Sequence, residues 1–290
     1  MSDIYTITTA VAFMAIFGII LSLILVAANK KLLVYEDPRI DTVEELLPHA
    51  NCGACGTAGC RVFAELLVKG QKKPAECTVN SKEMGLAIAN YLGVSLGSTE
   101  KRVARLACAG GSHVALIHAH YAGLTTCRAA TLISGGGKAC AWGCLGLGDC
   151  ETACEFGAIT MNRYNLPQVD ASACTACGDC VTICPKNLFE IHPLSHRLWV
   201  ACKNQEFGAV AEQWCEVACT ACERCAMDAP EGLIQIKNNL ATIDYAKNAL
   251  ASPIAIQRCP TGAIVWQDDQ QIQKGQNAKK VIRKEALPVT

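Results

Sequence analysis

Cysteines at a tight, repeated spacing are the residues of this chain that could do chemistry. Cys174, Cys177, Cys180 and Cys184 follow the pattern C-x2-C-x2-C-x3-C, and Pro185 comes directly after the last of them. In this pattern three thiolates hold one [4Fe–4S] cube and the fourth binds a neighbouring cube. The run therefore predicts two iron–sulfur clusters side by side.

A looser run of cysteines precedes this one and completes the pair. It consists of Cys140, Cys144 and Cys150, with Cys154 following after three further residues. Because the fourth cysteine of each run crosses to the other cube, we expect two mixed ligand sets. These are Cys140, Cys144, Cys150 and Cys184 for one cube, and Cys154, Cys174, Cys177 and Cys180 for the other.

A separate cysteine group lies nearer the N-terminus. Cys52, Cys55, Cys60 and Cys77 are separated by two, four and sixteen residues, and glycines stand between the first three. Glycine lets the backbone wrap closely around a cluster and leaves amides free to donate to its sulfurs. We expect a self-contained [4Fe–4S] site here, and the alternative is a zinc knuckle.

A third ferredoxin-like unit has lost half of its ligands. Cys219, Cys222 and Cys225 repeat the three-ligand turn, and Cys259 is followed by Pro260. By the crossing rule these four cysteines form one complete set. The positions of the second set carry no cysteine, since they are Ala229, Ala249, Ser252 and Ala255. One cube is therefore expected in this unit, and its twin is missing.

Four cysteines are left after these assignments, namely Cys108, Cys127, Cys202 and Cys215. Four thiolates are what one further cube requires, so the chain is expected to hold at least four clusters and, on this hypothesis, a fifth. The alternative is that they are buried reduced cysteines. Near them, the run GGGK at 135–138 lacks the upstream glycine and the following Ser or Thr of a phosphate-binding loop, so we expect a flexible loop.

Composition supports iron–sulfur chemistry over its rivals. The 290 residues include 20 cysteines, 18% are charged, and the net charge is zero, so bulk charge gives no reason to expect nucleic-acid binding. Disulfide-rich chains are typically short and secreted, and structural zinc prefers separated C-x2-C pairs. No acid–base residue is needed for electron transfer, and none is assigned a catalytic role.

The first thirty residues predict a membrane anchor. Residues 4–28 carry no charge and are mostly aliphatic or aromatic, long enough to cross a hydrocarbon layer of about 30 Å. A signal peptide would need a positive start and a shorter apolar run, whereas Asp3 is the only charge before this one. Lys30, Lys31 and Arg39 follow it, so the remainder is expected in the cytoplasm.

The predicted architecture is α+β, with one N-terminal transmembrane helix. We expect a helical 4Fe-4S domain, two ferredoxin-like units with short hairpins, and a basic tail. The predicted boundaries are 1–30 for the anchor, 31–97 for the helical domain, 98–139 for a connecting segment, 140–200 for the two-cluster unit, 201–266 for the degenerate unit and 267–290 for the tail.

This layout resembles the B subunit of the Rnf complex, the membrane-bound, ion-translocating ferredoxin:NAD oxidoreductase. The resemblance rests on the single span, the NCGACGTAGC segment with Cys77, the ferredoxin-like units and the segment GGGKACAWGCLGLGDC of the longer form. It implies a subunit of an oxidoreductase and translocase that accepts electrons from soluble ferredoxin. It also implies partner subunits that carry flavins, further clusters and the ion channel. The missing cube is a departure from the long form.

Two other functions stay open at this point. One is the cluster subunit of another membrane redox complex of hydrogenase type, which does not usually carry the Cys52–Cys77 arrangement. The other is a membrane-tethered redox sensor. Oxidation of ferredoxin coupled to NAD reduction would distinguish the Rnf-like function from both of these alternatives.

Overall fold

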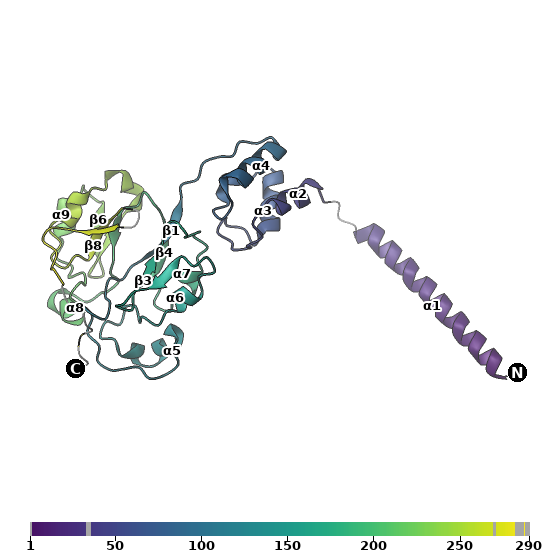
Figure 1. Cartoon of the computed structure of the whole chain (residues 1–290), viewed down its shortest axis with the longest axis horizontal. Coiled ribbons are helices and arrows are strands. Elements are labelled where there is room, and N and C mark those ends of the chain that lie inside the picture. Colours follow the sequence, from purple (N-terminus) through teal and green to yellow (C-terminus); the bar gives the residue numbers. More distant parts are fainter. Residues whose placement is uncertain (1, 33–35, 269–270, 282–286, 288–290) are drawn as a thin grey trace.

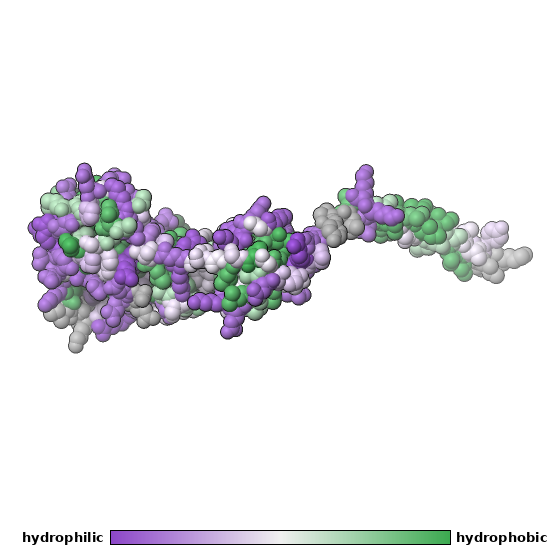
Figure 2. All heavy atoms as spheres, turned by 90° about the horizontal axis from the view of Figure 1, so that it is seen from above, coloured by the Kyte–Doolittle hydropathy of each residue, from purple (hydrophilic) through white to green (hydrophobic). Residues whose placement is uncertain are grey.

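The computed structural model describes the chain except for residues 1, 33–35, 269–270, 282–286 and 288–290. Helix α1, Ser2–Leu32, stands apart from the rest of the chain (Figure 1). Its stretch Ile7–Leu32 is strongly apolar up to Lys30 and Lys31, and no residue of its most apolar part is buried. Figure 2 shows it as a hydrophobic rod beside a largely hydrophilic body. At about 1.5 Å per residue its 26 residues measure about 39 Å, more than a hydrocarbon core of about 30 Å. By length and composition α1 therefore fits the predicted membrane anchor.

A small helical domain follows α1 and lies between it and the remaining body (Figure 1). Its elements are α2 (Arg39–Glu45), α3 (Cys60–Val68), the 3-10 turn η1 (Pro74–Glu76) and α4 (Lys82–Leu92). Val43, Phe63, Leu67 and Ile88 form its core. Helix α4 begins where the Ser81 hydroxyl accepts from the backbone N–H of Met84, and it ends at Gly93 in the left-handed conformation.

The first ferredoxin-like unit is closed by β1 (Arg102–Leu106), which pairs antiparallel with β4 (Phe189–Pro193). Between them lie α6 (Asp149–Thr152), β2 (Ile159–Met161), β3 (Pro167–Val169) and α7 (Asp179–Ile183), with β2 and β3 forming a hairpin. The unit thus begins some forty residues before residue 140, because its first strand lies in the segment expected to be only a connection.

The second ferredoxin-like unit repeats this plan. Strand β5 (Leu198–Val200) pairs antiparallel with β8 (Ile264–Asp268). Within it lie α8 (Gly208–Trp214), α9 (Arg224–Asp228), the hairpin of β6 (Ile234–Lys237) and β7 (Leu240–Ile243), and the 3-10 turns η3 (Tyr245–Leu250) and η4 (Pro253–Ile256). The expected tail contributes one more strand, β9 (Gln271–Lys274), which pairs with β8.

The two units are fastened to each other at the ends of their first strands. The N–H of Ala109, beyond β1, donates to the carbonyl of Ala201, beyond β5, at 2.9 Å. The Trp199 indole donates to the carbonyl of Leu106 at 2.9 Å. Both strands are followed by the same dipeptide, Ala-Cys, which gives Cys108 in one unit and Cys202 in the other.

An insertion in the first unit, between β1 and α6, holds the run GGGK. It contains α5 (Cys127–Leu132) and the 3-10 turn η2 (Ser134–Gly137). The run is not a free loop, because the carbonyl of Gly137 accepts from the N–H of His118 at 2.8 Å and Lys138 forms an antiparallel bridge with Ile117. Gly135, Gly136 and Gly137 all have positive φ, which explains why three glycines are found there.

Candidate metal centres

The twenty cysteines, all of which the structure describes, gather in five groups of four, and each group lines its own cavity. The cavities are alike in size, between 310 and 380 Å³ including space open to solvent. We name them the helical site (Cys52, Cys55, Cys60, Cys77), the Cys174 site (Cys154, Cys174, Cys177, Cys180), the Cys184 site (Cys127, Cys144, Cys150, Cys184), the junction site (Cys108, Cys140, Cys202, Cys215) and the outer site (Cys219, Cys222, Cys225, Cys259).

The helical site is built by the loop before α3 and the turn η1. The Asn51 side chain accepts from the N–H of Cys60 at 2.8 Å, which fixes the start of α3 against the loop. The Thr57 hydroxyl lies 3.1 Å from the sulfur of Cys55. Lys72 donates to the carbonyl of Cys55 at 3.0 Å and pairs with Glu76 at 2.7 Å. These contacts hold the four expected cysteines around one cavity.

The Cys174 site also contains the four cysteines expected from spacing. Cys174 and Cys177 come from the turn that leads into α7, and Cys180 lies in α7 itself. Cys154 crosses from just beyond the end of α6. The N–H of Ala104 in β1 lies 3.4 Å from the sulfur of Cys174, and the N–H of Ala158 lies 3.3 Å from that of Cys154. Backbone amides thus already point at two of the sulfurs.

The Cys184 site differs from the spacing in one member. Cys144, Cys150 and Cys184 line it as expected, but the fourth cysteine is Cys127 at the start of α5 rather than Cys140. The Asp149 carboxylate accepts from the N–H of Cys127 at 2.9 Å and so ties α5 to the start of α6. Only a long-range contact brings Cys127 here, and no short motif marks it.

The junction site collects Cys140 together with three of the four cysteines that spacing left over. Cys108 and Cys140 come from the first ferredoxin-like unit, and Cys202 and Cys215 from the second. The sulfur of Cys202 lies 3.4 Å from the N–H of Asn204 and 3.3 Å from that of Cys219. The sulfur of Cys108 lies 3.4 Å from the N–H of Cys144. Cys108, which follows β1, and Cys202, which follows β5, therefore line the same cavity between the two ferredoxin-like units.

The outer site contains the four expected cysteines. The place where the second cube of this unit would lie is occupied by residues of the protein. Cys222 is exposed, unlike the other nineteen cysteines. Of the four positions without cysteine, Ala255 is buried in the core of the unit and Ala229 packs against that core. The Ser252 hydroxyl accepts from Ile254 at the start of η4, and Ala249 is exposed in η3. Short turns have thus closed over the place of the second cube.

The buried thiols have strongly raised pKa values. Burial, reinforced by neighbouring cysteines, raises the pKa of Cys150 and Cys180 to about 12. For Cys150 the reinforcing neighbours are Cys127 and Cys184, members of its own group. Burial likewise raises the pKa of Cys225 to about 12. Such thiols are protonated at neutral pH unless a bound metal displaces the proton.

The donor set of each site suits a four-iron cube, since it consists of four cysteine thiols. Among the residues that the structure describes, no three His, Cys, Asp or Glu side chains converge as ligands of a single ion would. Four sulfurs at about 2.3 Å from one zinc would lie only about 3.8 Å from one another. A cube bonds each thiolate to a different iron and needs a wider cavity. Each of the five cavities is lined by four cysteines, which is the number of thiolates that one cube requires.

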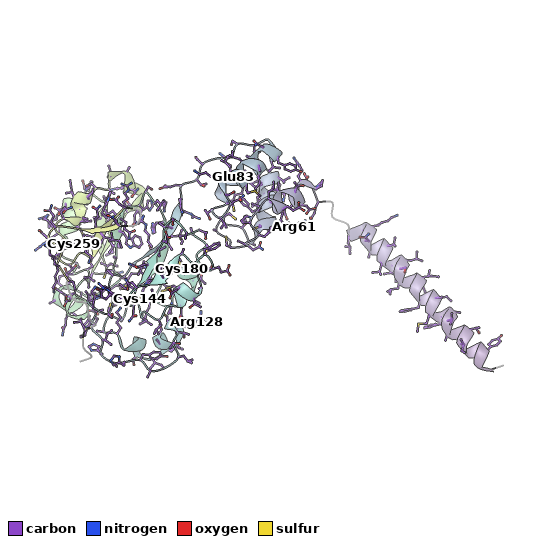
Figure 3. The ribbon with its side chains drawn as sticks, viewed as in Figure 1. Arg61, Glu83, Arg128, Cys144, Cys180 and Cys259 are labelled. Atoms are coloured by element: carbon purple, nitrogen blue, oxygen red, sulfur yellow. The ribbon has the colours of Figure 1, made fainter. Side chains whose placement is uncertain are left out.

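Direct contacts order the five sites into one row. Thr78 beside the helical site donates to the carbonyl of Thr175 beside the Cys174 site at 2.6 Å. Helix α6 carries Cys150 of the Cys184 site and leads to Cys154 of the Cys174 site. Helix α7 carries Cys180 of the Cys174 site and ends just before Cys184. The amide–sulfur contacts of Cys144 with Cys108, and of Cys219 with Cys202, link the junction site to the Cys184 and outer sites. Figure 3 shows Cys180, Cys144 and Cys259 at increasing distance from the helical domain that carries Arg61.

Two family models match the cysteine-bearing segments. The model described as "Putative Fe-S cluster" matches residues 47–79, which contain all four cysteines of the helical site. The model described as "4Fe-4S binding domain" matches residues 166–189, which contain Cys174, Cys177, Cys180 and Cys184. Both matches support iron–sulfur clusters in these two segments.

Curated relatives match almost the whole chain. The chain is 39% identical over 254 residues to the B subunit of the Na(+)-translocating ferredoxin:NAD(+) oxidoreductase complex of Acetobacterium woodii, covering 88% of this chain and 76% of the relative. It is 37% identical over 261 residues to the B subunit of the proton-translocating ferredoxin:NAD(+) oxidoreductase complex of Clostridium ljungdahlii, covering 89% and 92%. It is 35% identical over 256 residues to the B subunit of the ion-translocating oxidoreductase complex of Methanosarcina acetivorans, covering 88% and 96%.

These likenesses each cover 88–89% of the chain and agree with the iron–sulfur matches. The chain therefore belongs to the family of B subunits of ion-translocating ferredoxin:NAD oxidoreductases, the Rnf complexes.

Proposed function

We propose that this chain is the iron–sulfur subunit that receives electrons from reduced soluble ferredoxin and relays them to membrane partners that reduce NAD. The observation that carries the proposal is the sorting of all twenty cysteines into five groups of four that follow one another in a row. A [4Fe–4S] cluster bound by each group would supply one-electron transfer. Relatives named as ferredoxin:NAD(+) oxidoreductase subunits support the donor and the acceptor.

The proposed ligand sets are the five cysteine groups, so the chain would carry five clusters. Four sets correspond to the clusters expected from spacing, with Cys127 in the place of Cys140. The fifth is the junction set. In each site the protein supplies thiolates, nearby backbone N–H groups and a buried wall, and these are the features that set cluster potentials.

The two ends of the row suit different partners. At the outer site the ligand Cys222 is exposed, so a soluble protein can approach it closely. The helical site lies in the domain next to α1, and therefore nearest the proposed membrane anchor. We infer that ferredoxin docks at the outer end, and that the flavin-bearing and membrane subunits meet the helical end.

The orientation in the membrane is part of the proposal. Lys30 and Lys31 occupy the last turn of α1, on the side of the cysteine-bearing body. The positive-inside rule then places that body in the cytoplasm, where thiols are kept reduced and ferredoxin is available.

Iron and acid-labile sulfide per chain test the cluster number on anaerobically purified protein. We expect about 20 iron atoms per chain, with EPR of the reduced protein showing [4Fe–4S] signals. About 16 would leave the junction cysteines without a cluster, and zinc in place of iron would overturn the function.

Ferredoxin oxidation by membranes that contain the assembled complex tests the role. Replacing Cys222 with Ala removes a ligand at the outer end, so ferredoxin-dependent NAD reduction should fall to background. The matched control is Cys202→Ser in an otherwise identical complex, which should lose the same activity while leaving the outer site's signal in place. Full activity of the Cys222 variant would contradict entry at the outer end. No ferredoxin oxidation by the intact complex would favour a sensor.

A further inference from the structure

Lys138 is held against the junction site by a backbone that only glycine can form. It follows Gly137, whose φ is +79°, and a Cβ added to Gly137 would collide with the carbonyl oxygen of Ala119. The bridge to Ile117 and the bond from Ala139 N–H to the Leu116 carbonyl at 3.0 Å fix the residues on either side. The GGGK run thus serves to place one lysine.

The ammonium of Lys138 lies between two cluster sites. It donates to the carbonyl of Cys144, a member of the Cys184 site, at 2.6 Å, and to the carbonyl of Gly110, which lines the junction site. Lys138 itself lines the junction cavity.

Lys138 has no carboxylate partner among the ion pairs of the described residues. The other lysine that lines the junction cavity, Lys203, does have one, since its ammonium pairs with Glu190 at 2.7 Å. The charge of Lys203 is therefore offset locally. Within the described part of the chain, the hydrogen bonds of the Lys138 ammonium go to two neutral carbonyl oxygens.

An uncompensated cation beside a cluster has a definite electrostatic effect. Reduction adds one negative charge to the cluster, so a fixed positive charge nearby stabilises the reduced form more than the oxidised form. The interaction is strong where protein, rather than water, fills the space between the charges. Net charge around a cluster is one of the features that set its potential.

We propose that the positive charge of the Lys138 ammonium raises the reduction potentials of the junction and Cys184 clusters. The inference rests on the proposed function, because it presupposes clusters at these two sites. Lys138 would thus set the reduction potentials in the middle of the row, away from the two ends at which partners are proposed to bind.

Redox titration monitored by EPR tests this inference on the purified full chain. Lys138→Gln and Lys138→Met remove the charge, and Lys138→Arg keeps it. Both neutral variants should bind as much iron as the unaltered chain, with two of the five midpoint potentials shifted to more negative values. The arginine variant should keep the original potentials. Signals are assigned with variants that lack one cysteine pair of a single site.

Lys247→Gln is the matched control. Lys247 also donates to a backbone carbonyl, that of Glu231 at 3.1 Å, but it is exposed and lines none of the five cavities. Its removal should shift no potential.

Three results would overturn the inference. They are unchanged potentials in neutral variants with full iron, equal shifts in the arginine variant, and loss of iron from both neutral variants, which would make Lys138 a structural tie. Absence of iron–sulfur signals from the unaltered chain would instead overturn the proposed function.

Discussion

At the scale of single residues, the exchange of Cys127 and Cys140 decides how the middle of the row is built. Spacing assigns Cys140 to the set of Cys184, whereas the structure places Cys127 there and Cys140 in the junction site. The short gap between Cys140 and Cys144 does not bring both sulfurs to one cavity, because Cys140 faces the second ferredoxin-like unit.

Iron loss in double Cys→Ala variants shows whether two cysteines belong to the same cluster or to different ones. Each cluster that loses ligands should remove about four iron atoms. We expect Cys140→Ala with Cys215→Ala to cost about four, because both belong to the junction site, and Cys140→Ala with Cys184→Ala to cost about eight. Iron analysis of anaerobically purified variants measures this. A loss of only about four in the second pair would restore the assignment made from spacing.

The cysteines also show how far a sequence specifies its sites. Sixteen ligands in four sets could be proposed from spacing alone, and fifteen of these fall together as proposed. Cys108, Cys202 and Cys215 carry no motif, since each is separated from the others by a complete structural element. A site assembled from two units depends on their packing, which local spacing does not encode.

At the scale of elements, the glycine run between α5 and Lys138 is the segment whose ordered structure could not be predicted from the sequence. It reads as a flexible loop because three glycines have no side chains to pack. In the structure each adopts positive φ, and the turn is bonded to residues 117–119. Strand β1 was not predicted either, because its partner β4 lies more than eighty residues away in the sequence.

Gly137→Ala tests that this turn is a fixed part of the fold. The added methyl would collide with the Ala119 carbonyl as well as straining the backbone, so the thermal midpoint should fall markedly, by the equivalent of about 3 kcal/mol. Gly70→Ala is the matched control, because Gly70 has a φ of +71° but nothing within 4 Å of the added carbon.

The control isolates strain alone and should cost about 1 kcal/mol. Both variants are compared by circular dichroism melting under anaerobic conditions. Equal midpoints for the two variants would mean that the turn yields to the methyl group and holds Lys138 only loosely.

At the scale of the whole molecule, the cluster sites take the place of much of an ordinary core. Five cysteines of the junction and outer sites belong to the largest buried cluster, and three more belong to that of the first unit. The buried core of the helical domain contains no buried cysteine. Cluster binding is therefore expected to contribute much of the folding free energy beyond residue 100.

Removal of the metal should unfold the two ferredoxin-like units. After oxidation and chelation we expect the far-UV circular dichroism of residues beyond 100 to become that of a largely disordered chain. The helical signal of α1 in detergent should persist and serves as the internal reference. A native-like spectrum from iron-free protein would contradict this dependence.

The short connection after α1 has a consequence for how partners meet. Six residues, 33–38, separate α1 from α2, and so short a connection spans at most roughly 25 Å. If α1 crosses the bilayer, the helical site is confined to a thin layer beside it. Encounter with another membrane subunit then becomes a search in two dimensions at a high effective concentration. Weak contact surfaces are sufficient under those conditions, so this end of the row can exchange partners without a large, permanent interface.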